Sequence, residues 1–206
     1  MRTVLLILAV ILAAGVSACK QSGDTAGGSG DFRDAKWGMT KDEVKASEKL
    51  PLSDELPEAI TYISELAGKP AIIGYVFNKE GQLIRAGYLV DDEQIPPQDY
   101  VAAFDKAKKD MGVRLGMPST DRMLWTSGVQ DVTDPEQFGE ATCEGKMRYI
   151  AGWANERTAI NLTLSGYEGK CRLAAMYDSI DFYVLPAILE RNADKSAQPT
   201  PGPDAE

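Results

Sequence analysis

The sequence predicts an α+β protein made of two fused α-β-β-β units, with helices packed on antiparallel sheets. Two observations predict this class. Two segments carry helix signals: a capping box opens residues 40–48, and apolar residues recur at helical spacing over residues 98–111. Each segment is followed by runs rich in Ile, Val, Tyr and Phe, several of which alternate with polar residues as half-buried strands do. We expect the folded region to span residues 32–189, with sub-units near 32–93 and 94–189.

The first helix is expected to begin at a capping box. Glu43 follows Thr40 by three residues, so the Thr40 hydroxyl can accept a hydrogen bond from the Glu43 amide while the Glu43 carboxylate reaches back to Thr40. Met39 and Val44 occupy the two positions of a hydrophobic staple. These signals together predict a helix over residues 40–48.

The β-structure of the first unit is expected in residues 58–66, 71–78 and 82–90. The last two runs are joined by the sequence NKEG, which is typical of a short hairpin loop with Gly81 in the left-handed conformation. The first unit therefore reads as a helix followed by a small antiparallel sheet.

The second unit opens at Pro96 and Pro97, which favour a helix start, and Gly112 is a natural stop for the helix over 98–111. Its strands are expected over residues 122–127, 146–154, 157–165 and 171–179. A long acidic loop, residues 128–141, separates the first of these strands from the other three.

The N-terminus predicts export. Arg2 precedes 11 apolar residues, from Val4 to Ala14, whereas a helix that spans a bilayer needs about 20. A charged start, a short apolar run and small residues at its end make the secretory signal pattern. Residues 16–19, Val-Ser-Ala-Cys, resemble the bacterial lipobox, in which the cysteine carries a diacylglycerol and becomes the first mature residue.

This resemblance implies that Cys19 is lipidated and that residues 1–18 are a lipoprotein signal peptide; an ordinary signal peptide with an incidental cysteine is the alternative. Residues 19–31, rich in Gly and Ser, are expected to form a flexible tether, and residues 190–206 a disordered tail. Lys20 stands where an Asp often marks inner-membrane retention in Gram-negative lipoproteins. We therefore expect a lipid-anchored envelope protein, at the outer membrane facing the periplasm if the host is Gram-negative.

Cys143 and Cys171 remain after the anchor, and an even cysteine count in an exported chain predicts a disulfide. The strands that start near Lys146 and Lys170 flank the middle strand of a meander and start at the same end of the sheet, about 10 Å apart. Cys143 lies three residues before its strand, which is enough chain to cross the middle strand and meet Cys171. Two buried free thiols are the alternative.

The composition excludes several functions. The chain has no histidine, 31 acidic residues and 22 basic residues, with a formal net charge of −9. Ser-His-Asp hydrolysis, Cys-His hydrolysis and His-ligated metals are therefore excluded, and the acidic balance argues against a nucleic-acid partner. We predict no cofactor and no metal site, because the acidic residues of the loop 128–141 match no calcium-loop spacing.

Four aromatic residues of the second sheet are the candidates for a binding face: Tyr149, Trp153, Trp125 and Tyr177. Tyr149 and Trp153 share one face of a strand with only Ala151 between them, which leaves a shallow space between two rings. Trp and Tyr are favoured interface anchors, so this face is the best candidate site if it is exposed to solvent. Core and cross-strand packing is the alternative.

One family resemblance concerns the helix starts. The sequence Trp-Gly-Met-Thr-x-x-Glu-Val at residues 37–44 resembles the G-M-[ST]-x-x-E-V helix start of small envelope lipoproteins of the SmpA/OmlA type, and LGMP at residues 115–118 is similar to the L-G-x-P of that group. The related β-lactamase-inhibitor-protein-like fold stacks two such helix-plus-sheet units. The resemblance implies this fold and an envelope location. It does not carry over a role in outer-membrane assembly, because this chain is longer than the single-unit lipoproteins.

These observations predict a lipid-anchored envelope protein with a non-catalytic role, which binds another envelope protein as an assembly factor or inhibitor. A small-ligand receptor or a carboxylate-dependent enzyme is the alternative. Solvent exposure of Trp153 and Tyr149 favours the first class, and a deep pocket with two converging carboxylates favours the second.

Overall fold

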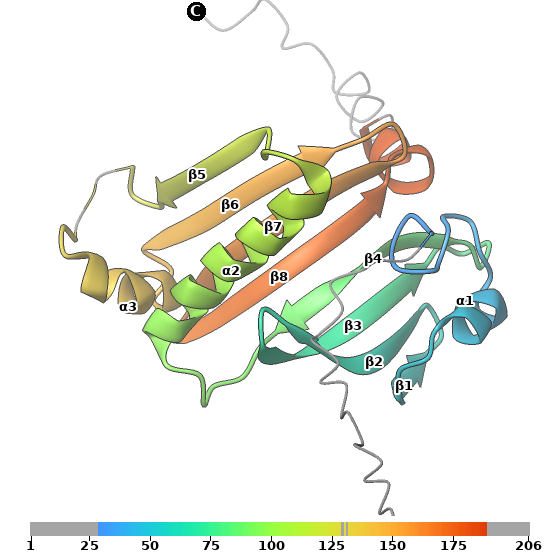
Figure 1. The fold of residues 1–206 in the computed structure, drawn as a ribbon, viewed down its shortest axis with the longest axis horizontal. Helices are drawn as coiled ribbons and strands as arrows, with labels where there is room; N and C mark the ends of the chain where they lie inside the picture. The colour runs from blue at the N-terminus through green and yellow to red at the C-terminus, as the bar shows by residue number, and fades with distance from the viewer. Residues whose placement is uncertain (1–28, 129, 131, 189–206) are drawn as a thin grey trace, which may run out of the picture.

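The computed structural model describes residues 29–128, 130 and 132–188. The expected signal peptide, the expected lipidation site Cys19, most of the expected tether and the expected tail lie outside these residues. The fold is α+β: a single eight-stranded antiparallel sheet, in the order β1-β2-β3-β4-β8-β7-β6-β5, carries its helices on one face (Figure 1).

The elements follow one another in two similar series. The strands are β1 (Leu52–Leu56), β2 (Ala59–Leu66), β3 (Lys69–Phe77), β4 (Leu83–Val90), β5 (Thr120–Trp125), β6 (Met147–Ala154), β7 (Thr158–Tyr167) and β8 (Lys170–Ser179). The helices are α1 (Lys41–Ser47), α2 (Pro97–Leu115) and α3 (Phe138–Cys143), with short 3₁₀ and π turns at η1 (Pro135–Gln137) and η2 (Ile180–Val184).

Each half of the chain is a helix followed by a four-stranded meander, α1 with β1 to β4 and α2 with β5 to β8. The halves join where their last strands, β4 and β8, pair antiparallel. The prediction of two helix-plus-sheet units is confirmed. Their strands form one continuous sheet, whose two edges are the first strands of the halves, β1 and β5.

The strand β1 is missing from the sequence-based expectation. The sequence LSDEL lacks the apolar alternation that indicates a strand, and all five of its residues are exposed. It lies at the sheet edge between Pro51 and Pro57, and its register with β2 shifts between Leu52 and Asp54. A short, charged and bulged edge strand of this kind resists pairing with other chains.

The helix α3 begins inside the segment 128–141, which the sequence predicts to be a loop, and ends two residues beyond it. Six residues are too few for a helical period to appear in the sequence. Gly139 allows the close packing of α3 on α2, since a Cβ at this position would lie 2.5 Å from the Pro97 carbonyl carbon. The buried side chains Thr142 and Cys143 then fix α3 to the sheet.

The helix α1 begins at the predicted capping box. The Glu43 amide donates to Thr40 Oγ1, at 3.4 Å, and the Thr40 amide donates to a Glu43 carboxylate oxygen, at 2.8 Å. The helix α2 continues one turn beyond the expected stop at Gly112 and ends at Gly116, which adopts a φ of 80°. Gly116 rather than Gly112 therefore provides the left-handed conformation that ends the helix.

We expect the Thr40→Ala variant to lower the free energy of unfolding by about 1 kcal/mol, because it removes the N-cap acceptor of α1. Chemical denaturation monitored by circular dichroism measures this change. Thr133→Ala is the matched control, since Thr133 is exposed and caps no helix of the described residues. Equal stability of the Thr40 variant and wild type would mean that the cap contributes nothing.

The three α-helices lie on the same side of the sheet, which we call the inner face (Figure 1). The loop before α1 also covers this face, where the two halves meet. Its Phe32 ring packs edge-to-face against Tyr75, Tyr88 and Tyr177, with centroids 4.9 to 5.4 Å apart. The Trp37 indole N–H donates to Thr158 Oγ1 at 2.9 Å. The segment that follows the tether therefore joins the two halves of the sheet.

Candidate binding surface

The structure places Tyr149 and Trp153 on the inner face, beneath α2. Trp153 is only 5% exposed, and its indole N–H donates to the Gly116 carbonyl at 2.9 Å. The Tyr149 ring lies 5.4 Å from the Phe104 ring of α2. The space between the two rings is therefore not open to water, because α2 packs over Ala151 and its neighbours.

The other two aromatic candidates also pack against inner-face elements. Tyr177 is buried against Phe32, and Trp125 contacts Phe138 of α3 with ring centroids 6.1 Å apart. The four side chains are therefore distributed beneath α2, α3 and the N-terminal loop, and they do not meet in one exposed surface. Their positions correspond to core and cross-strand packing.

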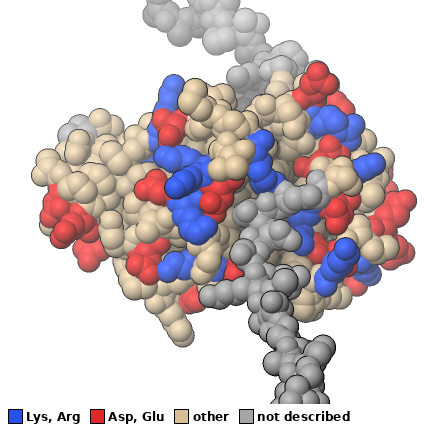
Figure 2. Space-filling view, viewed as in Figure 1, with Lys and Arg blue, Asp and Glu red and all other residues tan. Residues whose placement is uncertain are grey.

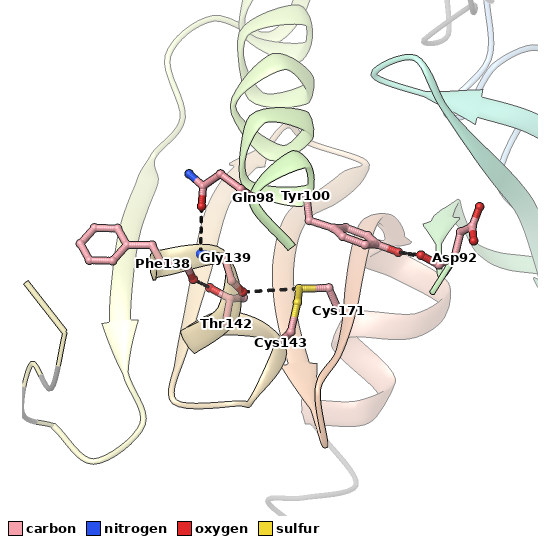
Figure 3. Close-up of a disulfide and its surroundings, with 8 residues drawn as sticks. All are labelled: Asp92, Gln98, Tyr100, Phe138, Gly139, Thr142, Cys143 and Cys171. Carbon is pink, nitrogen blue, oxygen red and sulfur yellow. Dashed lines mark hydrogen bonds between the residues drawn. A yellow bond between two sulfur atoms is a disulfide. The ribbon is translucent and has the colours of Figure 1, made fainter. Parts of the chain in front are cut away.

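The predicted pair Cys143 and Cys171 forms a disulfide, with Cα atoms 4.3 Å apart (Figure 3). It links the end of α3 to the start of β8 and crosses over β7, where Gly166 leaves room: a Cβ there would lie 2.4 Å from the Cys143 Cα. The Gln98 side chain accepts from the Gly139 amide at 3.2 Å. The disulfide and this contact hold α3 against α2 and the sheet.

The opposite side of the sheet, the outer face, carries a row of aligned side chains, most of which are apolar. The strand registers place Ile63 opposite Ile72, Ile72 opposite Leu89 and Leu89 opposite Ala174. The row continues across the second half through Thr163 and Ile150 to Arg122. Ile63 is 59% exposed and Ile72 45% exposed, although solvent-facing strand positions are normally polar. We call this set of residues the outer row.

A strip of small residues lies beside the outer row. Gly74 pairs with Gly87, and Gly87 pairs with Met176. A Cβ at Gly74 would meet no atom within 4 Å, so the space above this strand is open, whereas Met176 lies across Gly87. In the first half of the sheet, the outer row therefore lies beside a shallow recess above Gly74. A partner's side chains can fit into this recess.

Of the helices that the structure describes, η2 is the one that reaches an outer-face side chain. Its Tyr183 ring lies 4.2 Å from the Arg85 guanidinium, and Arg85 also forms an ion pair with Asp178. This contact covers one end of the outer face at the join of the two halves. The main contacts of η2 are with β4, β7 and β8, whereas Ile63 and Ile72 lie on β2 and β3.

The exposure of Ile63 and Ile72 is not among the sequence-based predictions. The sequence nevertheless contains a signal that Ile72 lies on the outer face. Ile72 and Ile73 are adjacent in one strand, and adjacent strand residues point to opposite faces. Because Ile73 is buried on the inner face, Ile72 must project from the outer face. A doublet of branched apolar residues in a strand with one covered face therefore indicates an apolar second surface.

A hollow of about 390 Å³ lies at the end of the outer face where β4 ends and β8 begins. Its two carboxylates are each held by a cation: Arg172 lies 2.8 Å from Asp91, and Lys170 lies 2.5 Å from Glu93. This hollow therefore does not present two free converging carboxylates, the feature that favours an enzyme.

A buried polar cluster on the inner face is internally satisfied. Arg33 donates two hydrogen bonds to the Glu48 carboxylate, at 2.9 and 3.1 Å, and the Tyr75 hydroxyl donates a third, at 2.8 Å. Burial raises the pKa of the Glu48 carboxyl, but these hydrogen bonds outweigh burial and the pKa lies below its usual value. Burial and the Glu48 contact raise the pKa of Tyr75. The cluster joins α1 to the sheet.

The described part of the chain contains neither a metal-binding cluster nor a membrane-spanning helix. No group of three or more His, Cys, Asp or Glu side chains in residues 29–128, 130 and 132–188 could hold a metal ion. No helix within those ranges is long and apolar enough to cross a membrane. The comparisons with known proteins add no relative: no family model, no curated protein and no solved structure matches the chain.

Proposed function

We propose that this chain is a lipid-anchored protein of the cell envelope that binds another protein through the outer face of its sheet. The observation that carries the proposal is that the exposed Ile63 and Ile72 and the half-buried Leu89 neighbour one another on three adjacent strands. Contiguous apolar side chains on a wet surface commonly mark an interaction site.

The size of the outer face also suits a protein partner. The outer row crosses seven strands, from β2 to β5 in the sheet order, and strands lie about 4.8 Å apart, so the row is roughly 29 Å wide. A standard interface covers about 800 Å² on each partner, which corresponds to a patch of similar width. A flat face of this kind matches a folded protein surface better than a small ligand, which needs an enclosing pocket.

The proposed lipid anchor and tether determine how far the binding face lies from the membrane. The lipobox-like sequence ends at Cys19, and the first described residue of the folded region is Ser29. The Gly- and Ser-rich composition of the residues between them predicts a tether that reaches roughly 17 Å, and such a tether would keep the sheet close to the membrane surface. The partner is therefore expected to be another envelope protein.

Site-specific photocrosslinking in the native envelope tests this proposal. A photoreactive amino acid replaces Ile72 in the full-length lipoprotein, and a second version carries it at Val113, which is 82% exposed on α2. We expect a discrete protein adduct from position 72 and none of that mass from position 113. The absence of an adduct from position 72, or the same adduct from both positions, would contradict the proposal.

A further inference from the structure

The second half of the outer face carries two arginines for which the described residues supply no carboxylate partner. Arg122 of β5 and Arg148 of β6 are both exposed. Arg122 stands opposite Ile150, and Arg148 stands opposite Leu124, so the two arginines are diagonal neighbours on the same face. Among the residues that the structure describes, neither takes part in an ion pair. We call these two residues the arginine pair.

The fold itself gives no reason for the arginine pair. The diagonal neighbours of antiparallel strands are close enough for long side chains to interact, so two like charges there repel each other. Carboxylates are abundant, since the chain has 31 acidic residues and a net charge of −9. The nearest acidic residue along β5, Asp121, points to the inner face and is held by Lys108 at 3.2 Å. The pair is therefore available to a group outside the chain.

The remaining cations at this end of the outer face are already neutralised. Arg172 is paired with Asp91 and Lys170 with Glu93. Figure 2 shows the opposite, helix-covered side of the molecule, where acidic and basic side chains lie intermingled over α2 and the first half. The arginine pair is thus a local site of positive charge on a protein that is acidic as a whole.

The outer row connects this charge to the apolar surface. Ile150, which stands opposite Arg122, belongs to the same row as Ile72 and Ile63. A partner that covers the row from β2 to β6 must also contact the arginine pair. Leaving two arginines desolvated beneath that partner without counter-charges would be costly, whereas carboxylates on the partner would pair with them and speed association.

We propose that the protein bound by the outer face is acidic at one end of its contact surface, where its carboxylates pair with Arg122 and Arg148 while its apolar side chains cover Ile63 and Ile72. This inference rests on the proposed function and specifies the partner's chemistry. An anionic lipid surface is the other conceivable occupant. The exposed isoleucines and the strong net negative charge of the chain favour the protein.

The test uses the full-length lipoprotein with the photoreactive residue at position 72. The variant Arg122→Glu/Arg148→Glu is compared with Lys36→Glu/Lys109→Glu, which reverses two exposed cations away from the outer face. Reversal turns two attractions into repulsions, so we expect the adduct yield to fall at least about tenfold. The lysine control should retain the wild-type yield. Melting curves check that both variants fold, and Arg122→Gln/Arg148→Gln should give an intermediate loss.

A photoreactive residue at position 148 identifies what faces the arginine pair. An adduct to an Asp- or Glu-rich segment of the same partner supports the proposal. An adduct to lipid, or to a basic segment, overturns it. If the position 72 adduct survives the arginine reversal at full yield, the acidic contact is wrong while the binding face stands. If position 72 gives no adduct in wild type, both proposals fall.

Discussion

Replacing both Cys143 and Cys171 by serine is expected to lower the free energy of unfolding by about 3–4 kcal/mol. The disulfide closes a loop with a sequence separation of 28 residues, and cross-linking a loop of that length restricts the unfolded chain. The loop contains β6, β7 and the hairpin to β8, so the effect concerns the whole second half. Denaturant unfolding of the oxidised protein and of the double variant measures the difference.

The same experiment separates the disulfide from the packing of its two sulfur atoms. A Cys143→Ala/Cys171→Ala variant retains an apolar environment and should lose a similar amount of stability, because the covalent link is the main contribution. Treatment of wild type with a reductant should reproduce the loss. A reduced protein as stable as the oxidised one would show that the link adds nothing to the fold.

The second large effect is expected from replacing Glu48 by alanine. We expect the free energy of unfolding to fall by about 3 kcal/mol or more, because removal of one partner leaves a buried charge without its counter-charge. The Glu48 side chain is only 2% exposed, and Arg33 and Tyr75 both donate to it. Glu58→Ala, at an exposed position in the turn between β1 and β2, is the matched control and should change stability little. Arg33→Met combined with Glu48→Ala should cost less than the two separate losses together.

The Glu48 contribution should also depend on pH. The folded-state pKa of Glu48 lies below its unfolded value, near 4.5, so the stabilisation is complete above the unfolded pKa and is lost as the pH falls through the folded pKa. The stability difference between wild type and Glu48→Gln should therefore be constant near neutral pH and shrink below about pH 4.5. A difference that grows on acidification would contradict the assigned sign.

Local sequence signals predict much of this fold, but they do not predict the elements that form only through tertiary contacts. The Thr40 capping box, the Gly81 turn and the alternation around Leu162 each depend on residues adjacent in the chain, and the structure contains all three. The edge strand β1 and the short helix α3 have no such local pattern. They form because tertiary neighbours, β2 for one and α2 with the disulfide for the other, supply the contacts.

The candidate site was harder to predict than the fold. The sequence identifies Tyr149 and Trp153 as sharing a strand face, but which face α2 covers depends on how the helix packs. Packing α2 over that face of β6 to β8 buries Trp153. Ile63 and Ile72 lie on the other face of the sheet, in β2 and β3, and are exposed. The arginine pair could not be predicted for the same reason, since it depends on the register between β5 and β6.

The central claim is that the outer face binds a protein partner, and one affinity measurement tests it most directly. The full-length protein is titrated with the protein captured through position 72, using wild type, Ile63→Asp/Ile72→Asp and the control Val113→Asp. Ile63→Thr/Ile72→Thr, which keeps branched strand residues, accounts for any loss of sheet stability. We expect both isoleucine variants to bind at least about tenfold more weakly than wild type, and Val113→Asp to bind as wild type does. Unchanged affinity of the folded isoleucine variants would contradict the account.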